Sequence, residues 1–189
     1  MPGETEESMF HGLYWSQARQ GAGVARHVSV GEPYLYATKG RDRAEHSVRR
    51  IDALVIRRDL AKGDALWAVE IKVTASDLRH EVSQPEKTAS WAQYVNAFYF
   101  LVPENLAGIA IAEVPKKYGV MVGTPFPQIK RRAERNPAPL PLPLDTWRRM
   151  LSKLGAHQIQ EIDGKTRASA HSARTLRTVP PNSETGDKP

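Results

Sequence analysis

The sequence lacks cysteine entirely. This absence excludes a disulfide framework, cysteine-ligated zinc, iron–sulfur clusters and thiol catalysis. No apolar stretch approaches the roughly 20 residues of a membrane span, and the acidic residues 1–7 lack the basic and apolar regions of a signal peptide. We therefore expect a cytoplasmic protein without membrane segments, whose 189 residues form one domain with a substantial core.

The net charge of +6 is unevenly distributed. Residues 1–125 contain 15 Lys/Arg and 15 Asp/Glu, whereas residues 126–189 contain 12 and 6. The positive excess therefore belongs to the C-terminal third, as a basic appendage to a neutral core. Such an appendage either binds phosphate groups without sequence preference or is a solvated, disordered tail.

The first 123 residues show alternating helix and strand patterns. Thr5 suits the N-cap of a helix reaching about Arg19, with acidic residues in its first turn. Ser76 suits the N-cap of a second helix to residue 82, and Pro85 the start of a third to residue 94. Strands are expected over 24–30, 51–56, 66–73, 97–102 and, as the last strand, 118–122, with 51–56 and 66–73 antiparallel. These elements predict an α/β (α+β) core with a central mixed β-sheet flanked by helices.

The composition changes after residue 123. Residues 124–143 contain repeated prolines and are expected to form a linker. Residues 144–163 are expected to be a short helical extension, whose amphipathic part, 144–154, can pack back onto the core. Residues 164–189 are rich in Ser, Thr, Arg and Pro and are expected to be a disordered basic tail.

Ionisable residues interrupt two apolar strands of the predicted core. Glu70 and Lys72 are two residues apart and therefore share a face of their strand. Asp52 begins the preceding apolar run and can become a cross-strand neighbour of Glu70. Two adjacent carboxylates repel each other unless a cation lies between them. Mg²⁺ or Mn²⁺ meets this need, with the backbone carbonyl of Ile71 as a further ligand, and Lys72 can orient water or offset charge on a phosphate.

A Glu-x-Lys tripeptide by itself is common on strand surfaces, and an ordinary solvent-facing pair is the alternative. Asp52, the apolar strand contexts and the flanking helices favour the metal site. The histidines form no metal-binding motif, and we interpret His80 and Glu81 as surface residues. Trp91 fits core packing or base stacking.

The same residues resemble the PD-(D/E)xK nuclease superfamily, particularly the small MmcB-like DNA-repair nucleases and related phage-type nucleases. The similarity runs through RRIDA (49–53), WAVEIK (67–72), ASDLR (75–79), WAQY (91–94) and AFYFLVP (97–103). It implies a restriction-endonuclease-like core over residues 1–123. It also implies Asp52 and Glu70 as metal ligands and Lys72 as the catalytic lysine. Glu6 or Glu7 would add an acidic group from the first helix, with Glu6 preferred. Ile51 departs from the motif by replacing its proline.

The predicted function is that of a Mg²⁺- or Mn²⁺-dependent deoxyribonuclease in repair, recombination or phage DNA processing. The alternatives are a non-catalytic DNA-binding or assembly protein and an RNA-processing enzyme of the same fold. The expected partner is DNA, and a homodimer or a larger DNA-processing complex is compatible with the sequence. Candidate DNA contacts, some of which also fit a solvated surface, are Arg49, Arg50, Arg79, Lys87, Lys130, Arg131 and Arg132.

Overall fold

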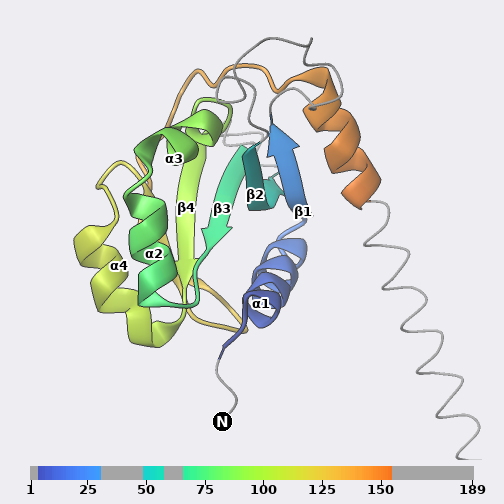
Figure 1. Cartoon of the computed structure of the whole chain (residues 1–189). Coiled ribbons are helices and arrows are strands. Elements are labelled where there is room, and N and C mark those ends of the chain that lie inside the picture. Colours follow the sequence, from blue (N-terminus) through green and yellow to red (C-terminus); the bar gives the residue numbers. More distant parts are fainter. Residues whose placement is uncertain (1–3, 31–48, 58–65, 155–189) are drawn as a thin grey trace, which may run out of the picture. The chain divides into compact units, whose positions relative to one another are not determined.

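The computed structural model describes residues 4–30, 49–57 and 66–154 and shows an α+β fold built on a six-stranded open sheet. The strands lie in the sheet in the order in which they occur along the chain (Figure 1). They are β1 (Gly23–Val30), β2 (Arg49–Ile56), β3 (Leu66–Ile71), β4 (Ala97–Val102), β5 (Gly119–Val122) and β6 (Gln128–Arg131). The helices are α1 (Glu6–Ala18), α2 (Ala75–Val82), α3 (Pro85–Ala92), the 3₁₀ turn η2 (Glu104–Leu106), α4 (Ala107–Glu113) and an unlabelled helix over 144–154.

The sheet is mixed, as the sequence predicted. β1, β2 and β3 are antiparallel neighbours, which confirms the expected antiparallel pair. β3, β4 and β5 run parallel, because helices connect them and return the chain to the same end of the sheet. β6 is antiparallel to β5.

Helices cover both faces of the sheet and form two apolar layers. On one face, Met9, Phe10 and Leu13 of α1 pack against residues such as Val69 of β3. On the other, α2, α3 and α4 contribute to a layer that also contains Trp91. Burial of one such side chain contributes roughly 1.5–3 kcal/mol. Trp91 is 2% exposed, so of its two predicted roles the structure shows core packing.

Local capping fixes the starts of the two helices nearest the site. Thr5 accepts a hydrogen bond from the N–H of Ser8, whose side chain reciprocates in a capping box, so the predicted first helix is confirmed. The predicted cap of α2 is wrong. Thr74, in extended conformation, accepts from the N–H of Asp77, and Ser76 lies inside the first turn.

The chain beyond residue 123 returns to the core instead of forming only a linker. Residues 128–131 form β6, so the strand at 119–122 is not the last. The helix over 144–154 packs as expected, because Met150 is fully buried and joins Leu142 in the core layer of α2–α4. Residues 155–163 and the predicted tail, 164–189, lie outside the described part. Within that part, no helix has the length and apolar character needed to cross a membrane.

Candidate metal site

The site begins where β2 and β3 separate. Their paired residues run from Ile56↔Leu66 to Ala53↔Val69. Beyond this point β2 stays paired with β1, and β3 continues beside β4. Asp52 and Glu70 are the next residues of the two strands and therefore lie at the fork. The Asp52 Oδ2 accepts a hydrogen bond of 2.8 Å from the N–H of Ile71. Where the pairing of β2 with β3 ends, a carboxylate therefore replaces a main-chain carbonyl as the acceptor for that amide.

A backbone irregularity at His27 adds a histidine to this fork. His27 has a φ of 52°, an uncommon conformation for a residue other than glycine. Ala25 and Val28 both pack in the α2–α4 layer although they are three residues apart. A regular strand would place such residues on opposite faces. The strand thus changes its alternation at His27, whose Nε2 lies 3.2 Å from the Glu6 Oε1.

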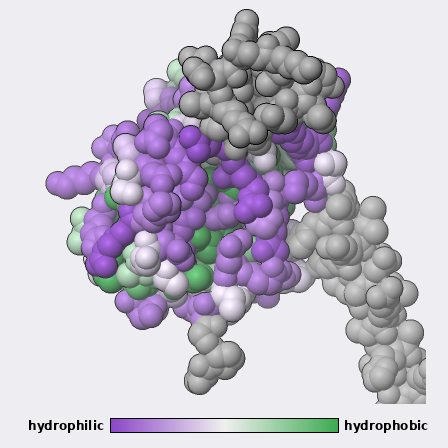
Figure 2. Space-filling view, viewed as in Figure 1, coloured by the Kyte–Doolittle hydropathy of each residue, from purple (hydrophilic) through white to green (hydrophobic). Residues whose placement is uncertain are grey.

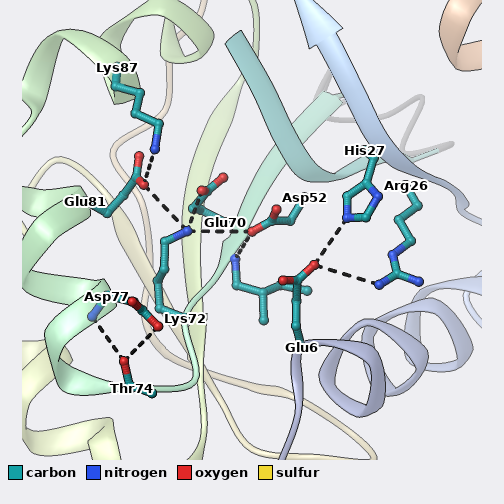
Figure 3. A network of polar contacts seen from close by, with 11 residues as sticks. Glu6, Arg26, His27, Asp52, Glu70, Lys72, Thr74, Asp77, Glu81 and Lys87 are labelled. Carbon is teal, nitrogen blue, oxygen red and sulfur yellow. Dashed lines mark hydrogen bonds and ion pairs between the residues drawn. The ribbon is translucent and has the colours of Figure 1, made fainter.

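Lys72 lies among three carboxylates (Figure 3). Its Nζ is 2.6 Å from the Glu70 Oε1, 3.8 Å from the Asp52 Oδ2 and 3.5 Å from the Glu81 Oε2. Lys87 of α3 donates a 2.6 Å hydrogen bond to the same Glu81 oxygen. Asp52, Glu70 and Glu81 are 8%, 5% and 4% exposed, so these charges interact at low dielectric.

Burial shifts the proton affinities of this cluster. Burial and the neighbouring Asp52 carboxylate raise the pKa of Glu70 to about 7. Burial also raises the pKa of Asp52, although Lys72 and the N–H of Ile71 act in the opposite direction. Burial would lower the pKa of Lys72, but the Glu70 and Asp52 carboxylates outweigh it and raise that pKa. The ionised forms of Asp52 and Glu70 are therefore unfavourable at this position, and a further cation beside them would stabilise those forms.

Glu6, His27 and Asp52 form a second group of potential ligands that shares Asp52 with the first. One ligand atom from each lies within 4.8 Å of the others. Arg26 lies 3.8 Å from the Glu6 Oε1 but pairs more closely with Glu7, the other first-helix candidate, and lowers the pKa of Glu7. Of the two glutamates, the structure therefore places Glu6 next to Asp52. The carboxylate oxygens fit Mg²⁺ or Mn²⁺, and the imidazole of His27 fits Mn²⁺ better than it fits Mg²⁺.

The cluster opens into a polar cleft of about 280 Å³. Its lining includes Glu6, the two lysines Lys72 and Lys87, and Ile71, whose carbonyl was the predicted backbone ligand. Figure 2, which shows the same side as Figure 1, shows a largely hydrophilic surface with only scattered apolar residues. Of the proposed ligands, Glu6 and Ile71 line this cleft, whereas Asp52 and Glu70 are buried beside Lys72, which does line it.

The predicted DNA contacts differ in their availability. Lys87 lines the cleft, and Arg49 and Arg50 lie at the start of β2, close to Asp52 in the chain. Arg79 forms bidentate hydrogen bonds with Glu113, which link α2 to α4. That pair is partly exposed and commits the Nε and Nη2 donors of Arg79 to a carboxylate.

The basic group Lys130–Arg132 lies away from the site, on or after β6, three strands from β3. The Arg131 guanidinium donates to the backbone carbonyls of Ile111, Val114, Pro115 and Tyr118. Its donors therefore hold the end of α4 against β5, which is a structural role and differs from the predicted phosphate contact. Lys130 and Arg132 are exposed.

Two residues of the site were not predicted from the sequence. The sequence does not predict that His27 faces the site, because its irregular backbone breaks the alternation on which strand predictions depend. The interpretation of Glu81 as a surface residue is wrong, since it is 4% exposed. The signal was available: Leu78, Glu81 and Val82 are spaced as one helix face, which points at the core.

Comparisons with known proteins bear on the fold alone. No protein family and no curated protein matches the chain. A protein of unknown function from Silicibacter pomeroyi has a similar structure, with a TM-score of 0.51 and 12% sequence identity. The match covers 98% of this chain and 100% of the other. At this identity the likeness shows a shared arrangement of helices and strands.

Proposed function

We propose that this protein is a Mg²⁺- or Mn²⁺-dependent DNA nuclease with a restriction-endonuclease-like core. The observation that carries the proposal is the convergence of Asp52, Glu70 and Lys72 at the fork between β2 and β3, beside a polar cleft. Buried charges of this kind are costly to maintain. Groups with strongly shifted pKa values in a cleft are typical of functional sites.

Each residue has a chemical role in this proposal. Asp52 and Glu70 hold the ion, with the Ile71 carbonyl as a further ligand, and Glu6 contributes a carboxylate from α1. Such an ion, when bound, polarises phosphoryl oxygens and lowers the pKa of a coordinated water. Lys72 orients the attacking water and offsets the negative charge that develops on the phosphate.

DNA as the substrate follows from the resemblance to PD-(D/E)xK nucleases and from the cations beside the site. Lys87 in the cleft and Arg49 and Arg50 on β2 are the proposed contacts to the phosphate backbone. A role limited to DNA binding receives less support, because Arg79 and Arg131 are engaged by protein acceptors.

The test is a cleavage panel of single-stranded, duplex and branched DNA and of RNA, with Mg²⁺, Mn²⁺ or a chelator. We expect metal-dependent cleavage of at least one DNA. Glu70→Ala and Lys72→Ala should each reduce the rate by roughly 10²–10³-fold while circular dichroism shows a folded chain. Lys116→Ala, an exposed lysine between α4 and β5 with no proposed role, is the matched control and should retain activity. Intact DNA with both metals would refute the proposal, and cleavage of RNA alone would reassign the substrate.

A further inference from the structure

Lys72 occupies the place that the proposed metal requires. Its Nζ lies 2.6 Å from the Glu70 Oε1 and 3.8 Å from the Asp52 Oδ2, the two carboxylates proposed as ligands. Mg²⁺ coordinates oxygen at about 2.0–2.1 Å. An ammonium in hydrogen-bond contact with the same oxygens would be strongly repelled by the ion, because both charges are shielded from water. Lys72 must therefore move away from Glu70 when the metal binds.

A third carboxylate is ready to receive it. The Glu81 Oε2 lies 3.5 Å from the Lys72 Nζ, on the α2 side of the cluster and outside both groups of potential ligands (Figure 3). Glu81 is 4% exposed, and a buried carboxylate needs a cationic partner. Lys87 already supplies one at 2.6 Å. Glu81, held in place by Lys87, can therefore also form an ion pair with Lys72, and it does so without ligating the metal.

We propose that Glu81 is a positioning residue that receives Lys72 when the metal binds. This inference rests on the proposed function. Lys72 then has two positions, on Glu70 in the metal-free protein and on Glu81 in the metal-bound protein. With Glu6 included, four carboxylates share this region with the Lys72 and Lys87 ammonium groups and, when all are ionised, leave two negative charges. A divalent ion cancels these charges, so the cluster stops repelling a phosphodiester only after the metal has bound.

The experiment measures Mn²⁺ affinity by isothermal titration calorimetry in the absence of nucleic acid. The variants are Lys72→Met, Glu81→Gln and the double variant. Lys72→Met should bind Mn²⁺ more tightly than the native chain, because it removes the competing ammonium. Glu81→Gln should weaken binding by about fivefold, since Lys72 then stays on Glu70. In the Lys72→Met background the same Glu81 change should alter affinity by less than about twofold.

Lys87→Met provides an independent variant in case Glu81→Gln does not fold. It leaves Glu81 to Lys72 alone and should tighten Mn²⁺ binding, whereas weaker binding would contradict the proposal. Equal weakening by Glu81→Gln in both backgrounds would also overturn it, because Glu81 would then act on the metal without Lys72. A native chain that binds no Mn²⁺ would refute the proposed function. Mn²⁺ binding with unchanged affinity in the Lys72 and Glu81 variants would refute this inference alone.

Discussion

Mn²⁺ should stabilise the folded protein, and it should do so more strongly at pH 8 than at pH 6. Glu70 must be ionised to bind a metal, but burial and Asp52 raise its pKa to about 7. Protons therefore compete with the metal for this carboxylate below pH 7. The affinity is fully expressed above the pKa of Glu70 and is lost as the pH falls through it.

The size of the effect follows from that pKa. At pH 8 about nine-tenths of Glu70 is ionised, and at pH 6 about one-tenth, so the apparent Kd should rise about tenfold. A Mn²⁺ concentration of about 100 Kd at pH 8 stabilises the fold by ~2.7 kcal/mol. The same concentration is then about 10 Kd at pH 6 and contributes ~1.4 kcal/mol. At about 2–4 °C per kcal/mol, Tm should rise by roughly 5–11 °C at pH 8 and roughly 3–6 °C at pH 6.

Thermal unfolding followed by circular dichroism, with and without Mn²⁺, measures these shifts. Asp52→Asn and Glu70→Gln should each remove most of the Mn²⁺-dependent rise in Tm. Glu113→Gln is the matched control, because this carboxylate pairs with Arg79 away from the fork. The reasoning fails if Mn²⁺ raises Tm equally at both pH values, or if Asp52→Asn retains the full shift.

Three further predictions test individual contacts. His27→Asn, which tolerates the positive φ, should weaken Mn²⁺ binding more than Mg²⁺ binding in calorimetric titrations, because an imidazole is lost; equal losses would argue against ligation by His27. Arg131→Met should reduce the free energy of unfolding in urea by ~2 kcal/mol, because its hydrogen bonds to carbonyls are lost, and it should leave cleavage unchanged. Lys130→Met is the control and should leave the free energy of unfolding unchanged. An unchanged urea midpoint for Arg131→Met would refute that structural role. Gly119→Ala should cost ~1–3 kcal/mol in the same assay, because a methyl group there would overlap the Tyr99 ring; an unaltered stability would show that the ring moves freely.

Five of the six strands and the first helix could be predicted because each depends on local sequence. Apolar runs predicted β2, β3 and β4, and Thr5 with the acidic residues after it predicted α1. β6 has the sequence Gln-Ile-Lys-Arg and is largely exposed, so hydrophobic alternation could not reveal it. Its place in the sheet comes from hydrogen bonding to β5, which no local pattern encodes.

The residues of the candidate site also fall into those that local sequence predicts and those that it does not. Glu70 and Lys72 could be placed together because their spacing of two residues puts both on one strand face. Asp52 followed from the antiparallel pairing of β2 with β3. His27 depends instead on tertiary structure, because an irregular backbone directs it toward Glu6. The burial of Glu81 could be read from the helix spacing, but its contacts with Lys72 and Lys87 depend on how α2 and α3 pack.

The fork in the sheet and the charged cluster are one structural feature. If β2 and β3 stayed paired beyond Ala53 and Val69, main-chain groups would satisfy one another and the N–H of Ile71 would not need the Asp52 carboxylate. Separation of the strands brings buried anions beside that amide, where burial raises the pKa values of Asp52 and Glu70. Lys72 offsets part of this cost in the metal-free protein. Under the proposed function, a divalent cation would stabilise these carboxylates, and their unfavourable burial as anions would favour the metal-bound form.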